Sequence, residues 1–295
     1  MFGRAADGST VTEYYDVLVI ATGVANGFWR RPTLQSQAEI RDDLRAARDR
    51  LAAAESIIVV GGGPAAVSST AQLATSWPGK RVDLYFPGDR ALVGHHPRVW
   101  DQVARRLRDL DVRLHTGHRA VIPDGFDCDQ ITREPVRWCG GQPTASADAV
   151  VWAVGRARPN TDWLPPALLD DDGFLRVAGD LRVPGYDNVF GLGDVAATDP
   201  LRSSARNRAD ALLAHNVRAV CAGRPLRKYR PPRRRWGSVL GPQPDGLEMY
   251  TANGRAVRFP AWLFDRVLLP YFVRWGYYRG VRNNDPLAAS AVVNQ

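Results

Sequence analysis

Cysteine and metal-ligand patterns are nearly absent from this sequence of 295 residues. Its three cysteines, Cys128, Cys139 and Cys221, show neither C-x-x-C nor C-x-x-x-x-C spacing. This spacing gives no sign of a disulfide framework, a zinc knuckle or a redox-active dithiol, and it favours a cytoplasmic protein. The five histidines match no metal-binding motif either, so we predict no metal site.

Long apolar runs are missing as well. No window of about twenty uncharged apolar residues occurs, so we expect no membrane-spanning helix. The N-terminus is polar and lacks the apolar core of a signal peptide, so none is expected. With 45% hydrophobic and 24% charged residues, the composition is that of a soluble globular protein, and the length suffices for two domains.

Lysine is rare, because Lys80 and Lys228 are the only two. The net charge of +8 therefore rests on arginine, much of it within residues 227–235 (RKYRPPRRR). Such a run is usually a solvated linker, and a site for anionic lipid or nucleic acid is the alternative. We expect no nucleic-acid partner.

The chemistry that the chain does carry is concentrated in residues 56–68, SIIVVGGGPAAVS. An apolar strand, a glycine turn and a helix of small residues follow one another there. The turn has the G-x-G-x-x-A form of a dinucleotide fingerprint: Gly61 permits the tight bend, Gly63 lets a pyrophosphate approach the backbone, and Ala66 allows close packing. Pro64 opens the helix, whose N-terminus supplies N–H donors. An ordinary turn in another kind of α/β protein is the alternative.

The next strand, expected over residues 81–86, bears on the choice of nicotinamide cofactor. A carboxylate at its end would accept the ribose hydroxyls, whereas a nearby arginine would accommodate a 2′-phosphate. Phe86 stands at this end and cannot accept a hydroxyl, while Arg90 follows shortly after. NADPH is therefore at least as well supported as NADH. A plain turn pair of Asp89 and Arg90 is the alternative.

Further strands are expected to end on glycine, where a backbone can approach a cofactor. An aspartate at the carboxyl edge of a parallel sheet points into the ligand crevice of a doubly wound fold. The strands and their ends are 17–20 with Thr22 and Gly23, 149–154 with Gly155, and 188–192 with Gly193 and Asp194. We also predict helices over 34–54, 97–110 and 203–222, and a β-meander over 117–147.

Four segments in this order resemble the FAD-dependent pyridine nucleotide oxidoreductases: DVLVIATG, IIVVGGGPAAV, VVWAVGRARPN and NVFGLGDVA. The chain is most similar to the branch of apoptosis-inducing-factor-like proteins and type II NADH dehydrogenases, over about residues 8–230. The resemblance implies an α/β flavoprotein fold with two dinucleotide-binding domains, in which a Rossmann-like NAD(P) domain is inserted in an incomplete FAD domain. A small C-terminal α+β domain follows. The implied domains are 1–32 and 156–225 for FAD, 33–155 for NAD(P), and 226–295.

The resemblance also assigns the site residues. Thr22, Gly23, Gly193 and Asp194 would contact FAD, and Gly61, Gly63, Ala66 and Gly155 would border the nicotinamide dinucleotide. The family's chemistry is hydride transfer from NAD(P)H to the flavin, with electrons passed on to a quinone or another acceptor. The protein then supplies orientation and electrostatics, so no catalytic side chain is predicted.

Three departures from the family pattern leave a second function open. Family members begin with a βαβ unit that carries the FAD glycine fingerprint, whereas Met1 stands just before DVLVIATG, so we expect that unit to be missing. Ser68 replaces a glutamate near the nicotinamide. Arg206 and Arg208 replace the glutamines that type II dehydrogenases carry near the quinone. The alternative is a truncated, non-catalytic NAD(P)-binding remnant without flavin.

The C-terminal segment 259–281 is rich in tryptophan, tyrosine and arginine. Such a segment suits a helix that lies flat at a membrane interface, with the basic run adding attraction to anionic lipid. The protein would then be cytoplasmic and peripheral at the inner face of the membrane. A cap over the cofactor domains is the alternative for this segment, and a homodimer is a further expectation.

Overall fold

The structure is a computed structural model that describes residues 2–4, 10–25, 28, 35–154, 158–197, 209–229 and 237–277. Gly155, Arg206, Arg208 and residues 230–235 of the basic run lie outside these ranges. The domain boundaries given above remain predictions.

A parallel sheet forms the centre of the half that contains the glycine turn. Its four strands lie in the order β7-β6-β5-β8, and every neighbouring pair is parallel. Strand β5 is a continuous apolar run because both of its faces are covered. The bounds are Ser56–Val60 (β5), Arg81–Tyr85 (β6), Arg113–His115 (β7) and Ala149–Trp152 (β8).

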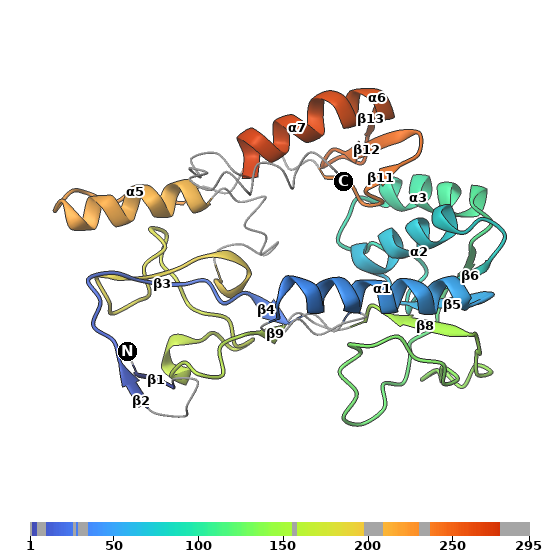
Figure 1. The fold of residues 1–295 in the computed structure, drawn as a ribbon, viewed down its shortest axis with the longest axis horizontal. Helices are drawn as coiled ribbons and strands as arrows, with labels where there is room; N and C mark the ends of the chain where they lie inside the picture. Colours follow the sequence, from blue (N-terminus) through green and yellow to red (C-terminus); the bar gives the residue numbers. More distant parts are fainter. Residues whose placement is uncertain are drawn as a thin grey trace.

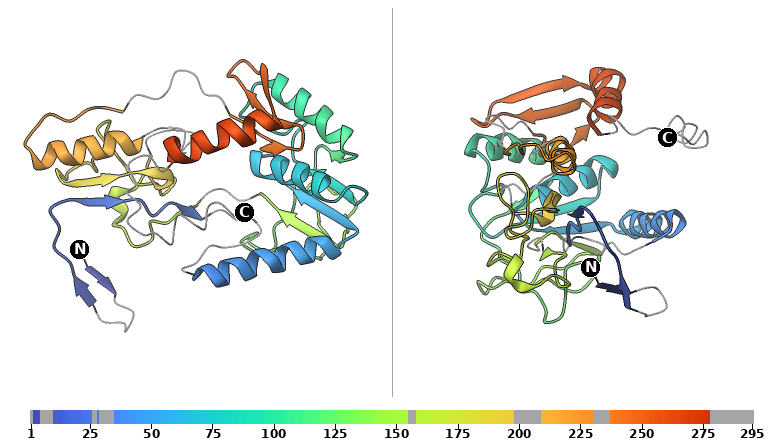
Figure 2. Two further views of the ribbon diagram at one scale, coloured as in Figure 1. Left: turned by 45° about the horizontal axis from the view of Figure 1, so that its top comes forward. Right: turned by 90° about the vertical axis from the view of Figure 1, so that its left-hand side faces the viewer.

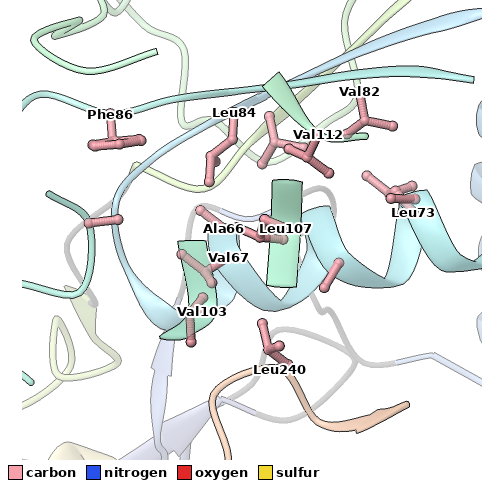
Figure 3. Close-up of a cluster of buried hydrophobic side chains, with 14 of the residues drawn as sticks. Ala66, Val67, Leu73, Val82, Leu84, Phe86, Val103, Leu107, Val112 and Leu240 are labelled. Carbon is pink, nitrogen blue, oxygen red and sulfur yellow. The ribbon is translucent and has the colours of Figure 1, made fainter. Parts of the chain in front are cut away.

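Three helices pack on one face of this sheet, and the connection 116–148 covers the other (Figure 1). Ile57 and Val59 lie in the cluster with the helices, whereas Ile58 and Val60 pack beneath the connection, as the two-residue period of a strand requires. Figure 3 shows the helical side, where Val67 and Leu107 meet below the strands. The helices are Gln37–Ala53 (α1), Pro64–Ser76 (α2) and Pro97–Asp109 (α3).

A second, smaller parallel sheet joins segments far apart in the chain. Strand β3 (Leu18–Ile20) pairs with β10 (Val189–Gly191), and helix α5 (Ala209–Cys221) packs beside them. Two segments connect the smaller sheet to the larger one. They pair with each other as the antiparallel strands β4 (Val24–Ala25) and β9 (Arg158–Pro159). The remaining elements are β1 (Phe2–Arg4) paired with β2 (Thr10–Thr12), and 3-10 turns at Pro166–Leu168 and Gly193–Val195.

The C-terminal piece is an antiparallel sheet followed by a helix, and it is stacked over α2 and α3 (Figure 2). Leu240 enters the core cluster between these helices (Figure 3). Arg106 of α3 makes two bonds to the carboxylate of Asp245, at 2.5 and 2.8 Å, and this pairing lowers the pKa of Asp245. The elements are β11 (Pro242–Gln243), β12 (Gly246–Tyr250), β13 (Ala256–Pro260) and one helix that includes α6 (Ala261–Leu263), α7 (Leu269–Tyr271) and π-helical segments at Phe264–Leu268 and Phe272–Tyr277.

The β-meander predicted over 117–147 is wrong. This segment makes only single bridges, Ala120 with Trp138 and Val136 with Ala145, plus one from Thr132 to Val150 of β8. Prolines and glycines interrupt the segment, and a proline cannot donate to a strand ladder. Trp138 of this segment and Trp152 of β8 nevertheless pack together in one buried cluster. An irregular connection therefore covers the second face of the sheet.

Candidate functional site

Gly61 ends β5 in a conformation that only glycine readily adopts. Its φ is +144°, and a Cβ at this position would lie 2.3 Å from the carbonyl oxygen of Ala153, just after β8. On its other side the same Cβ would meet Ala66 of α2 at 3.1 Å. The bend therefore brings β5, the end of β8 and the first turn of α2 into direct contact, which requires a small residue at both 61 and 66.

Gly63 is different, because it faces open space. It is the N-cap of α2 with φ −87°, and a Cβ there would meet nothing within 4 Å. Pro64 occupies the first helical position, where the missing N–H costs nothing. Among the described residues, no group accepts a hydrogen bond from the amides of Gly63, Ala65 or Ala66. These donors at the positive end of a helix dipole fit the pyrophosphate of a dinucleotide.

The loop after β6 closes one side of this turn. The amide of Leu92 donates to the Gly62 carbonyl at 2.7 Å, and Leu92 holds a left-handed conformation with φ 55°. The Arg90 guanidinium donates to the carbonyls of Val93 and His95, at 3.2 and 3.1 Å. In this structure Arg90 therefore shapes the loop beside the glycine turn, and its contact with a 2′-phosphate remains a prediction.

The residues expected around FAD come together at the end of the smaller sheet. Ile20 pairs with Gly191 in the parallel register, and the Leu192 amide donates to the Ile20 carbonyl at 3.0 Å. Thr22–Gly23 and Gly193–Asp194 thus leave the sheet side by side at its carboxyl edge. Gly23 and Gly193 have φ of +67° and +80°, and a Cβ on either glycine would meet no atom within 4 Å, so the backbone is open to a ligand. This edge fits the ribityl or pyrophosphate part of a flavin nucleotide.

Asn160 belongs to this edge and was missed from the sequence. Its side-chain amide donates to the Thr22 carbonyl at 2.8 Å, and the Thr22 hydroxyl donates to the Asn160 carbonyl at 2.9 Å. The amide of Asn160 also donates to the Gly23 carbonyl at 3.1 Å. These three bonds, two of them between residues 138 apart in the sequence, hold the Thr-Gly turn in position. The only sequence signal was the Pro-Asn pair after the linker, which is too common to assign this role.

Ser68 has a structural partner that explains why a glutamate would be unsuited here. Its hydroxyl donates to the Leu240 carbonyl at 3.4 Å, and Gln72, one helical turn later, donates to the same oxygen at 3.2 Å and to the Pro242 carbonyl at 2.8 Å. An ionised glutamate is an acceptor only and could not replace the serine as a donor. This face of α2 holds the C-terminal piece.

The fold is that of the α/β flavoprotein reductases. The model of the pyridine nucleotide-disulphide oxidoreductase family matches residues 3–217, and the chain belongs to that family. All three cysteines lie in the described part of the chain and are free, and burial raises the pKa of the Cys128 thiol. The family match confirms the family predicted from the sequence.

The chain is also similar in sequence to proteins from several organisms. The chain is 24% identical to the oxidoreductase ptaL of Pestalotiopsis fici over 230 residues, which are 76% of this chain and 59% of that protein. It is 24% identical to apoptosis-inducing factor homolog B of Dictyostelium discoideum, over 68% of this chain and 56% of that one. It is 29% identical to an NADH dehydrogenase-like protein of Mycobacterium tuberculosis, over 66% and 52% respectively. The chain thus spans about half the length of the curated relatives that it matches.

Solved structures show the same fold. LpdA from Mycobacterium tuberculosis superposes with a TM-score of 0.58 at 20% identity, over 90% of this chain and 53% of that chain. A ferredoxin reductase from Rhodopseudomonas palustris superposes with a TM-score of 0.58 at 23% identity, over 79% and 57%. At these identities the likeness concerns the fold alone.

Proposed function

We propose that this protein is an FAD-dependent NAD(P)H oxidoreductase. When bound, the flavin would accept hydride from the reduced nicotinamide and pass electrons to a quinone or another acceptor. The observation that carries the proposal is the open glycine turn at the carboxyl edge of the larger parallel sheet. Its amides at Gly63 and Ala65 make no hydrogen bond to another described residue, and a dinucleotide fingerprint would use such amides to hold a diphosphate.

The chain's own residues would bind and orient the two nucleotides. The first amides of α2 would hold the nicotinamide dinucleotide, with Gly155 beside it and Arg90 near the ribose. Thr22, Gly23 and Gly193 would present backbone to FAD, fixed in place by Asn160. Asp194 would accept a hydrogen bond from a ribityl hydroxyl.

The visible spectrum of the purified full chain, with FAD added, tests this function. We expect flavin bands that bleach when NADH or NADPH is added without oxygen. Asp194→Ala should weaken FAD binding about 10- to 100-fold, because it removes a hydrogen bond to an ionised group. Asp187→Ala is the matched control, since Asp187 is exposed and pairs with Arg182. A colourless protein that still binds NAD(P)H would instead identify a non-catalytic remnant.

We also propose that the C-terminal helix docks the protein on an anionic membrane surface. Trp262 and Tyr271 expose 63% and 60% of their area along this helix, with Leu269 and Phe272 also exposed. Aromatic residues of this kind favour the interface between lipid headgroups and acyl chains. No helix in the described part of the chain is long and apolar enough to cross a bilayer.

Replacing the aromatic residues should separate membrane docking from folding. Trp262→Ser combined with Phe272→Ser should lower binding to vesicles that contain phosphatidylglycerol by about tenfold or more. Tyr14→Ser is the control, because Tyr14 is a 95% exposed aromatic residue elsewhere on the chain. Co-sedimentation with the vesicles measures the binding of the double variant and of the control. Equal binding by the double variant and the control would show that the helix is not the docking element.

A further inference from the structure

A cavity of about 340 Å³ lies between α1 and α2, along the side of α2 that carries Ser68, Ser69 and Ser76. Its walls are mostly apolar, with Leu51 from α1, Leu73 and Trp77 from α2, and Val151 from β8. Small-molecule sites in proteins measure about 300–1,000 Å³ and are mostly apolar with a few polar groups. The cavity matches this description in size and in lining.

Hydrogen bonds fix both ends of helix α1. A capping box of Ser36 and Glu39 fixes its first turn, with bonds of 2.6 and 2.8 Å between them. At the other end Arg50 donates to the Ile131 carbonyl at 2.8 Å, and Lys80 donates to the Ala52 carbonyl at 2.6 Å. Between these anchors no side chain of α1 is buried. The middle of the helix therefore reaches the core only through partly buried residues such as Ala47 and Leu51, and the cavity lies beside them.

The apolar stripe of α1 faces this unfilled space. Leu44, Ala47 and Leu51 stand at helical spacing and all line the cavity, yet Leu44 is 49% exposed. These side chains leave apolar surface in contact with water, and an apolar molecule of matching size would cover that surface, which is favourable.

The charge at the cavity selects the kind of molecule. Among the described residues that line it, Arg48 carries the sole charge, and hydroxyls of Ser69 and Ser76 lie on the α2 side. A guanidinium on one wall and hydroxyl groups on the other favour a carboxylate, with which arginine forms strong charge-assisted bonds. We propose that this cavity binds an amphiphilic monocarboxylate, with its apolar chain between α1 and α2 and its carboxylate at Arg48.

Titration calorimetry of the full chain with decanoate, decanol and butyrate tests the proposal. Decanoate should bind saturably with one molecule per chain, decanol more weakly, and butyrate without measurable heat, because it lacks the apolar chain. Arg48→Gln should weaken decanoate binding about tenfold and leave decanol unchanged. Arg45→Gln is the control, since Arg45 lies on the same helix but pairs with Asp42 and does not line the cavity.

Two variants that fill the cavity complete the test. Ala47→Phe from α1 and Ser69→Leu from α2 should each abolish decanoate binding while the thermal midpoint stays level or rises. Having two variants keeps the test decisive if one of them fails to fold. If decanoate gives no heat of binding with the wild type, or still binds to a folded variant whose cavity is filled, the proposal is wrong. NADPH binding is measured in parallel and should be the same in all variants, so this result stands apart from that for the nucleotide edge.

Discussion

The Gly61→Ala variant is expected to lose about 3–5 kcal/mol of unfolding free energy, because strain at positive φ and steric overlap add together. The new methyl would sit 2.3 Å from the backbone oxygen of Ala153 and 3.1 Å from Ala66. Neither neighbour is the end of a flexible side chain, so β5 would have to separate from β8 or α2. The thermal midpoint should fall by about 10 °C, as followed by circular dichroism.

Gly63→Ala is the matched comparison two residues further on. Its φ is ordinary and its surroundings are empty, so the thermal midpoint should stay within about 2 °C of the wild type. The methyl would, however, project into the place where a diphosphate meets the amides, and NAD(P)H affinity should fall about tenfold or more. Calorimetry with both nucleotides measures this. A Gly63→Ala protein with unchanged affinity would falsify the assignment of this turn to the dinucleotide.

Replacing Asn216 by alanine is expected to cost about 2–4 kcal/mol, because several backbone groups lose their partner inside the protein. Asn216 is fully buried on α5. Its side-chain amide donates to the carbonyls of Asp180 and Arg227, at 2.8 and 2.9 Å, and its oxygen accepts from the Arg227 amide at 2.9 Å. One side chain thus joins the helix to two loops and leaves none of its own groups unsatisfied.

Urea unfolding followed by far-UV circular dichroism measures this loss. Arg218→Ala is the control, since Arg218 is exposed on the same helix and should change stability by less than about 0.5 kcal/mol. If Asn216→Ala were as stable as this control, the three bonds would contribute no net free energy. Loss of flavin binding together with stability would further link α5 to the edge at Gly193.

Local rules predicted the parallel sheet and its helices well. The apolar run at 56–60, the glycine bend and the capped helices each have a signal within a few residues, and the structure places them within a few residues of the prediction. The connection 116–148 was mispredicted, because alternating residues between prolines look like strands while the missing N–H groups prevent a ladder. Its place under the sheet depends on Trp138 and Trp152, which no local pattern reveals.

The residues of the candidate sites also fall into those that a local pattern predicts and those that it does not. The glycines and Asp194 are predicted from motifs, because a nucleotide site would need those residue types in that order. Asn160 and Asn216 were invisible, because each bridges segments that meet only after folding. The bonds from Ser68 and Gln72 to the C-terminal piece belong to the same class: a departure from the family pattern was noticed, but its partner 172 residues away was not.

The fastening of Leu240 and Pro242 to α2 has a mechanical consequence. Ser68 and Gln72, one helical turn apart, and the Arg106–Asp245 pair on the neighbouring helix attach the C-terminal piece to α2 and α3. The aromatic helix follows β13 without a break, so the surface that carries Trp262 and Tyr271 is joined to α2 through the same small sheet.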